Sequence, residues 1–285
     1  MQMESALTVN VHRSVGPLPS AQRDGELFEA RLFGPFQILR TGSGAVESKA
    51  MARSSVRTLL KWFLLNPGDR FEAGTLCEVL WPNASAPVLS KRLDVTVHHL
   101  RRLLEPDLPA RQRSRFVRSD RDRLYWFDLG GCWWTDLQEA QALSVSARRA
   151  ESVGDDEGAI ALYESIVQCH EKTFLLENVF DEAFASARAA QEVAHQEALN
   201  RLLPVYVRVG ALHKAIPCAL ALLELDPYSE VAATTLAEIH LRQGHQISAR
   251  KQLFESLQRV QQELGCRPSE HALQVWRQVA DPAQR

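Results

Sequence analysis

The sequence predicts two domains, an α+β domain at residues 27–130 and an all-α domain of repeated helix pairs at residues 131–285. Two observations support this division. The first part places short segments rich in strand formers on either side of three amphipathic helices. The second part is helical in pattern throughout and repeats one spacing of Gly and Ala. A chain of 285 residues is long enough for two domains, at about 100–200 residues each.

The two parts also differ in charge. Residues 29–130 hold 17 Lys and Arg against 11 Asp and Glu, a balance of +6, whereas the rest of the chain holds 16 against 24, a balance of −8. The net charge of −2 conceals this asymmetry. A basic part joined to an acidic part is typical of a nucleic-acid-binding domain attached to a domain with another role.

The composition predicts a cytoplasmic protein. The five cysteines are scattered and form no Cys-x-x-Cys pair, so we expect neither a disulfide framework nor a zinc site. No apolar stretch reaches the length of about 18 residues that a membrane span needs. Residues 1–26 lack the apolar run of a signal peptide and are rich in Ser, Gly and Pro, so we expect a disordered extension there.

The α+β domain is expected to begin with a small sheet. Residues 29–40 are rich in strand formers and predict either two short strands or one bulged strand, because Gly34-Pro35 interrupts them. A turn follows at residues 41–44, and a further short strand is expected at residues 45–49.

Two helices are expected next. The first should be capped by Ser54 or Ser55 and stopped by Asn66-Pro67-Gly68, and its apolar residues recur at helical spacing. These residues are Val56, Leu59, Leu60, Phe63 and Leu64. The second should run from about residue 73 to residue 80 and end at Trp81-Pro82, with Trp81 packed in the core.

Residues 88–105 predict a third helix with one apolar face and one basic face. The apolar face has the spacing i, i+4, i+7 and i+11 and consists of Leu93, Val97, Leu100 and Leu104. At about 100° per residue, the opposite face consists of Lys91, Val95, His98 and Arg102, flanked by Arg92, His99 and Arg101. The only acid within this outer surface is Asp94. Such a surface is suited to contact with phosphate.

An arginine-rich hairpin is expected after this helix. Residues 115–127 place Phe116 and Val117 on one strand and residues 124–127 on the other, with a turn at residues 119–122. Six arginines lie within residues 111–123. The order of sheet, two helices, basic helix and hairpin is that of a winged helix-turn-helix, in which the basic helix enters the DNA major groove.

Several segments resemble a known family. Leu-Cys-Glu-Val-Leu-Trp-Pro at 76–82, Leu-Asp-Val-Thr-Val-His-His-Leu-Arg-Arg-Leu-Leu-Glu at 93–105 and Leu-Tyr-Trp-Phe at 124–127 resemble the OmpR-type winged helix. With Leu-Phe-Gly-Pro-Phe at 32–36 and the two-domain order, the chain resembles the SARP class of bacterial transcriptional activators. In that class a bacterial transcriptional activator domain follows the winged helix. The resemblance covers residues from about 29 to 280.

The resemblance implies which residues contact DNA. It places Val95, His98 and Arg102 against base edges, and it places Arg118, Arg121 and Arg123 against the backbone or the minor groove. The full expected set is Lys91, Arg92, Val95, Thr96, His98, His99, Arg101, Arg102, Arg118, Arg121 and Arg123. His98 and His99 stand where this class commonly has Ser and Arg, and Leu124 stands where it usually has Gly. The DNA sequence that relatives read therefore does not transfer to this chain.

The second domain is expected to be similar to tetratricopeptide repeats. A Gly-x4-Ala spacing occurs at Gly154/Ala159, Gly210/Ala215 and Gly244/Ala249, and the last two glycines are 34 residues apart, the period of that repeat. Pro227 lies where such a repeat ends, and extra sequence is inserted around residues 172–201. Segments 223–230 and 263–270 are similar to the activator domain of the SARP class. We expect Tyr163, Tyr206 and Trp276 to lie in the core.

The sequence thus predicts a DNA-binding transcriptional regulator, in the first instance an activator. The chain lacks a phosphate-binding loop and a dinucleotide-binding glycine motif, so no enzyme activity, cofactor or metal is expected. The expected partners are double-stranded promoter DNA, bound as direct repeats, and a second copy of the chain. The resemblance implies RNA polymerase holoenzyme as a further partner of the helical domain. Two alternatives stay open: a helical-repeat scaffold or peptide sensor whose winged helix binds protein, and a repressor. No effector is indicated.

Overall fold

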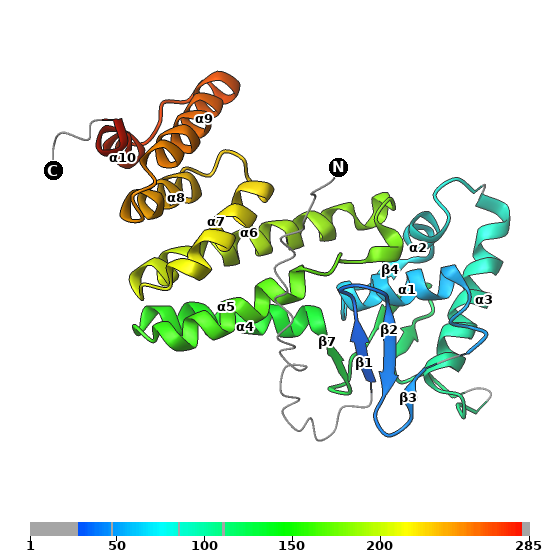
Figure 1. Cartoon of the computed structure of the whole chain (residues 1–285). Coiled ribbons are helices and arrows are strands. Elements are labelled where there is room, and N and C mark those ends of the chain that lie inside the picture. The colour runs from blue at the N-terminus through cyan, green and yellow to red at the C-terminus, as the bar shows by residue number, and fades with distance from the viewer. Residues whose placement is uncertain (1–27, 47, 85, 110–111, 281–285) are drawn as a thin grey trace, which may run out of the picture.

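The computed structural model describes residues 28–46, 48–84, 86–109 and 112–280, so the extension expected at residues 1–26 lies outside the described residues. It contains an N-terminal α+β region and a C-terminal helical region (Figure 1). The elements of the α+β region are β1 (Phe28–Arg31), β2 (Gln37–Arg40), β3 (Gly44–Ala45), α1 (Ser54–Leu65), β4 (Phe71–Glu72), α2 (Ala73–Leu80), α3 (Ala86–Leu104), β5 (Val117–Ser119), β6 (Leu124–Phe127) and β7 (Trp133–Thr135). This is the predicted order of sheet, three helices and hairpin, with the short strands β4 and β7 in addition.

The first sheet has the strand order β3-β2-β1-β7. β1 pairs antiparallel with β2, with Phe28 opposite Arg40, and pairs in parallel with β7, with Phe28 opposite Trp133. Residues 29–40 therefore form two strands, one of the two predicted arrangements. The strand expected at 45–49 is shorter and earlier than predicted, because only Gly44 and Ala45 pair with β2. β7 was not predicted, since its three residues are too few to show an alternating pattern.

The second sheet has the order β4-β6-β5 and contains the predicted hairpin. Val117 lies opposite Phe127, and Ser119 lies opposite Tyr125. Ser119 therefore belongs to a strand rather than to the predicted turn. The sheet faces α1 through aromatic rings, since Phe63 of α1 stacks on Phe127 with ring centres 5.8 Å apart.

The ends of α1 correct one prediction and confirm another. The residue before the helix is Arg53, no side chain caps this end, and Ser54 and Ser55 lie inside the first turn. The expected serine cap is therefore wrong. The predicted stop is confirmed: Asn66 leaves the helical conformation, and Gly68 has a φ of 83°, a value that glycine adopts without strain.

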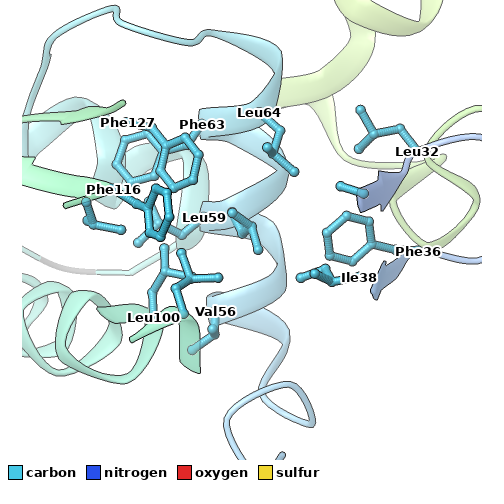
Figure 2. Packing of buried hydrophobic residues seen from close by; sticks show 14 of the residues in the cluster. Leu32, Phe36, Ile38, Val56, Leu59, Phe63, Leu64, Leu100, Phe116 and Phe127 are labelled. Atoms are coloured by element: carbon cyan, nitrogen blue, oxygen red, sulfur yellow. The ribbon is translucent and has the colours of Figure 1, made fainter. Parts of the chain in front are cut away.

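Helix α1 lies at the centre of the first core. Figure 2 shows Leu59 and Phe63 pointing toward Phe116 and Phe127 of the hairpin side, with Leu100 of α3 beneath them. On the other side, Ile38 of β2, together with Leu32 and Phe36 of the β1–β2 connection, faces the same helix. The helix therefore buries two faces, and its six buried residues are Val56, Leu59, Leu60, Lys61, Phe63 and Leu64.

The helical region is a row of antiparallel helices. Its elements are α4 (Asp136–Ser152), α5 (Asp156–His170), η1 (Leu176–Asn178), η2 (Glu182–Phe184), α6 (Ala185–Arg208), α7 (Leu212–Leu225), α8 (Glu230–Arg242), α9 (Gln246–Leu264) and α10 (Glu270–Ala280). Each helix packs on the next, as Figure 1 shows. None of the helices in the described part of the chain is long and apolar enough to cross a membrane.

The Gly-x4-Ala pattern marks the turns of three helix pairs, α4/α5, α6/α7 and α8/α9. Gly154, Gly210 and Gly244 have φ values of 77°, 74° and 79° directly after the first helix of each pair. The alanines five residues later, Ala159, Ala215 and Ala249, are fully buried in the second helix. Gly thus closes the turn without strain, and Ala lets the paired helices approach. Tyr163 and Tyr206 are buried as predicted, whereas Trp276 is half-buried against the last core cluster.

The insertion after α5 packs on the α+β region. Phe174, Leu175 and Phe184 belong to the first core cluster, and Phe174 forms an antiparallel bridge with Phe33. The backbone N–H of Leu175 donates to Leu32 O at 2.8 Å. The predicted boundary after residue 130 therefore does not separate the two cores, because residues 174–184 complete the first one.

A buried lysine joins the same two parts. Lys61 of α1 is 1% exposed, and its Nζ donates to Glu177 Oε2 at 2.8 Å and to Asn178 Oδ1 at 2.6 Å. Burial lowers the pKa of Lys61. Burial alone would raise the pKa of Glu177, but the hydrogen bond and charge of Lys61 lower it. The two hydrogen bonds of Lys61 therefore join the insertion to α1.

Replacing Phe184 with Ala tests whether the insertion is part of the first core. Phe184 is fully buried, so Phe184→Ala should lower the free energy of unfolding by about 3–5 kcal/mol. Phe180, in the same insertion, is 93% exposed, so Phe180→Ala should change it by less than about 0.5 kcal/mol. Urea unfolding of the whole chain measures both. Equal values for the two variants would contradict this account of the junction.

Candidate nucleic-acid interface

The apolar face of α3 is confirmed. Leu93, Val97, Leu100 and Leu104 are each no more than 3% exposed. The helix packs against both α1 and α2 through this face. It begins at Ala86, slightly before the predicted start at residue 88, and ends at Leu104. Because the inner face is fixed in this way, the outward direction of every other α3 side chain follows from its position.

The outer face of α3 is exposed and basic. Lys91, Arg92, His98 and Arg102 are all exposed. Val95 lies among them and is 50% exposed, which leaves an apolar side chain in the middle of a charged surface. At about 100° per residue, Lys91, Val95, His98 and Arg102 form one ridge along the helix. We call this ridge the outer ridge.

Thr96 does not belong to the exposed surface. It is 5% exposed, its Oγ1 donates to the backbone O of Arg92 at 2.9 Å, and it lies 3.5 Å from Ser55 Oγ of α1. Its hydroxyl is therefore used inside the protein. Sequence spacing placed Thr96 beside basic neighbours but did not show that α1 covers it, so we leave it out of the candidate interface.

The hairpin is fastened to α3 at one side of the outer ridge. Arg123 donates to Ser90 Oγ and to Asp94 Oδ1, both at 2.8 Å, and Tyr125 Oη lies 3.3 Å from the same Asp94 oxygen. Arg123 has a φ of 59°, in the left-handed region. Asp94 is thus neutralised by the hairpin, and the predicted DNA contact Arg123 holds the hairpin in place.

Arg101 makes a second link between α3 and the hairpin. Its Nε donates to Val117 O at 2.9 Å and its Nη2 donates to Ser119 Oγ at 3.0 Å. Burial lowers the pKa of its guanidinium. The structure therefore gives Arg101 a positioning role, since most of its side chain faces β5.

The remaining predicted arginines differ in their surroundings. Arg102 Nη1 donates to the carbonyl oxygens of Pro106 and Leu108 at 2.8 and 3.0 Å, and its Nε and Nη2 form no hydrogen bond with a described residue. Arg118 pairs with Asp128 at 3.0 Å. Arg121 is exposed at the tip of the hairpin.

The two histidines of α3 lie beside one another with ring centres 5.8 Å apart. His98 is exposed on the outer ridge, and His99 is half-buried on the flank away from the hairpin. Burial, then the positive charge of Arg53, lowers the pKa of His99. His99 is therefore neutral at pH 7 in the free protein.

Several residues of this surface were not found from the sequence. Ser90 and Tyr125 hold Arg123 and Asp94 in place, and Arg40 donates from Nη2 to Leu104 O at 2.6 Å. Arg53 lies close enough to influence His99. Arg40 and Arg53 had no signal in the local pattern, since they come from a strand end and a loop far from α3 in the chain. Among the described residues, no group of three or more His, Cys, Asp or Glu could hold a metal ion.

Comparison with protein families identifies the helical region. Residues 135–279, just over half of the chain, match the family described as bacterial transcriptional activator domain. This chain belongs to the bacterial transcriptional activator domain family. That family is one of regulators rather than of enzymes. The match covers α4 to α9 and almost all of α10, which we call the activator domain.

Solved structures give a second comparison. The structure of Mycobacterium tuberculosis EmbR in complex with a low affinity phosphopeptide is similar to 90% of this chain, with a TM-score of 0.69 and 19% identity. This chain spans 65% of that one. The TPR2B-domain:pHsp70-complex of yeast Sti1 is similar to 50% of this chain and 97% of that one, with a TM-score of 0.37 and 12% identity. No curated protein matches the chain significantly. The EmbR similarity shows that the α+β region and the activator domain form one known fold.

The links between α3 and the hairpin can be tested by hydrogen exchange. Arg123→Gln removes the bonds to Ser90 and Asp94, so amides of β5 and β6 should exchange several-fold faster while the activator domain is unaffected. Arg121→Gln, which removes a charge at the exposed tip, is the matched control and should leave exchange unchanged. Identical hairpin exchange in the two variants would show that Arg123 does not hold the hairpin.

Proposed function

We propose that this protein is a DNA-binding transcriptional activator whose α+β region is a winged helix-turn-helix. The observation that carries the proposal is the outer ridge: four exposed residues, three of them basic or histidine, on a helix whose opposite face is fully buried. An α-helix fits the major groove of B-DNA, which is about 12 Å wide. The β5–β6 hairpin, docked beside the ridge, is then the wing.

The outer ridge and the neighbouring Arg92 contain groups for both kinds of DNA contact. Lys91 and Arg92 are exposed cations that can neutralise backbone phosphates. Val95 is the apolar member, and a half-exposed Val between cations suits contact with the methyl group of thymine. His98 can donate to or accept from a base edge. Arg102 keeps Nε and Nη2 for DNA while its Nη1 holds the 106–108 turn.

The arrangement of the two regions is compatible with activation. Figure 1 shows α3 at one end of the molecule and α9 and α10 at the other. A chain bound to DNA through α3 therefore leaves the end of the activator domain accessible. We propose that this domain contacts RNA polymerase holoenzyme and that two copies bind as a homodimer on direct repeats. The family to which the chain belongs and the resemblance to the SARP class support this proposal.

The salt dependence of DNA binding tests the proposal. Binding that depends on phosphate contacts releases counterions, so affinity for duplex DNA should fall steeply, about linearly on a logarithmic scale, between 50 and 200 mM salt, a range of about fourfold. A gel-shift titration on DNA selected from a random pool measures it and also yields the half-site spacing. Affinity that does not change with salt would favour the alternative of a scaffold or peptide sensor. Transcription from the selected site then separates an activator from a repressor.

The pH dependence of binding tests the role of His99. Its pKa is lowered in the free protein, and contact with phosphate favours the charged form, so the pKa should rise in the complex. Binding then takes up a proton, and affinity should increase as the pH falls from about 8 to about 6. His99→Ala should remove most of this increase. An identical pH profile for wild type and His99→Ala would exclude His99 from phosphate contact.

A further inference from the structure

A basic hollow lies beside α3, on the flank away from the hairpin. It has a volume of about 430 Å³ and is bounded by the β2–β3 turn, the loop before α1 and the second half of α3. Four basic side chains line it, namely Arg40, Lys49, His99 and Arg102. No acidic side chain is among the described residues that line it. Sequence reasoning had assigned no role to Arg40 or Lys49.

Arg40 is held in the hollow with one donor unused. Its Nη2 donates to Leu104 O at 2.6 Å, and its guanidinium carbon lies 4.9 Å from the ring centre of Phe28. Its Nε is buried and has no hydrogen-bond partner among the described residues. A buried donor without a partner is unfavourable, and the hollow that Arg40 lines is the side from which an acceptor approaches its guanidinium.

The hollow and the hairpin lie on opposite flanks of the outer ridge. Asp94 and Arg101 lie on the flank that binds the hairpin. His99, at about 40–100° around the helix from the ridge residues, lies on the other flank and faces Arg53 and the hollow. A helix in the major groove has one phosphate backbone on each side. The hairpin is placed to meet one backbone, and the hollow is placed to meet the other.

We propose that Arg40, Lys49 and His99 bind one phosphate group of the DNA backbone on the flank opposite the hairpin. This rests on the proposed function, because it takes the outer ridge to lie in the major groove. Arg40 supplies a fixed guanidinium, Lys49 an exposed ammonium and His99 an imidazole that becomes charged against the phosphate. The contact carries no sequence information and sets the position of α3 across the groove. A free phosphate ion has the same chemistry as a phosphate of the DNA backbone. The experiments below distinguish these two ligands.

The first experiment compares salt slopes. Lys49→Gln and Arg40→Gln should each reduce the slope of log affinity against log salt by about 1 and weaken binding to all duplex sequences about equally. Lys251→Gln, on exposed α9 far from α3, is the matched control and should bind as wild type does. Thermal melting checks that Arg40→Gln folds, and Lys49 is an exposed side chain whose loss does not disturb the core.

The second experiment locates the contact on DNA. Neutral methylphosphonate linkages are placed one at a time along the selected duplex. One position, on the strand away from the hairpin, should weaken wild-type binding severalfold and should weaken Lys49→Gln distinctly less, because only Arg40 and His99 still contact that phosphate in the variant. If every neutral linkage weakens the variant as much as wild type, Lys49 touches no phosphate and the proposal is overturned.

A third arm identifies the source of the phosphate. Inorganic phosphate is titrated into each protein at constant ionic strength, and the melting temperature is recorded. In one outcome, Lys49→Gln and Arg40→Gln show the wild-type salt slope for DNA binding, and phosphate raises the melting temperature of wild type only. This outcome would overturn the DNA contact and assign the hollow to a free phosphate group. Normal slopes without stabilisation would overturn the site altogether. If wild type itself binds no duplex DNA, the proposed function fails, and the phosphate titration alone decides whether the hollow binds an anion.

Discussion

The α+β region is organised around the burial of α1 on two faces. One face of this helix packs against α3 and the hairpin, and the other packs against the first sheet and the insertion after α5. The position of the outer ridge is therefore set indirectly: α1 fixes the inner face of α3, and the inner face fixes which side chains point outward. A cavity beside α1 would loosen the sheet and the outer ridge together, since closely packed interiors relax only partially.

Helix α1 also fixes where the activator domain lies, through its contact with the insertion. Lys61 projects from α1 into the insertion, where Glu177 and Asn178 satisfy it, and Phe36 of the β1–β2 connection lies 4.7 Å from its Nζ. A buried charge pair is weak evidence for added stability, because desolvation offsets much of the attraction. Its geometric requirement is strict for the lysine, however, since removal of Glu177, which is itself 36% exposed, leaves the buried Lys61 with Asn178 alone. The junction therefore favours one relative placement of the two regions, in which the activator domain extends away from α3.

Sequence patterns identified what depends on local periodicity and missed what depends on contacts between distant segments. The apolar spacing in α3 located its buried face, and the Gly-x4-Ala spacing located the three turns of the helix pairs, because both follow from helix geometry alone. The burial of Thr96 depends on α1, and the use of Arg101 and Arg123 as links depends on the hairpin. The serine cap failed because Arg53 precedes the helix without any side-chain cap. Arg40 reaches α3 only because β2 ends beside Leu104, a contact that no local pattern could predict.

The count of arginines overstates the charge available for the proposed contact with DNA. Ten Lys and Arg lie between residues 91 and 123, but Arg123 is paired with Asp94 and Arg118 with Asp128. A cation that is already paired with a carboxylate gains less binding energy from a phosphate. Either its attraction to the carboxylate weakens, or the carboxylate stays close to the DNA and repels it. Lys91, Arg92 and Arg121 are exposed and form no ion pair with any described residue. Counterion release should therefore follow these side chains and the basic hollow rather than the total. The paired arginines instead have a structural role. They hold the surface in a shape that places exposed cations on both sides of α3.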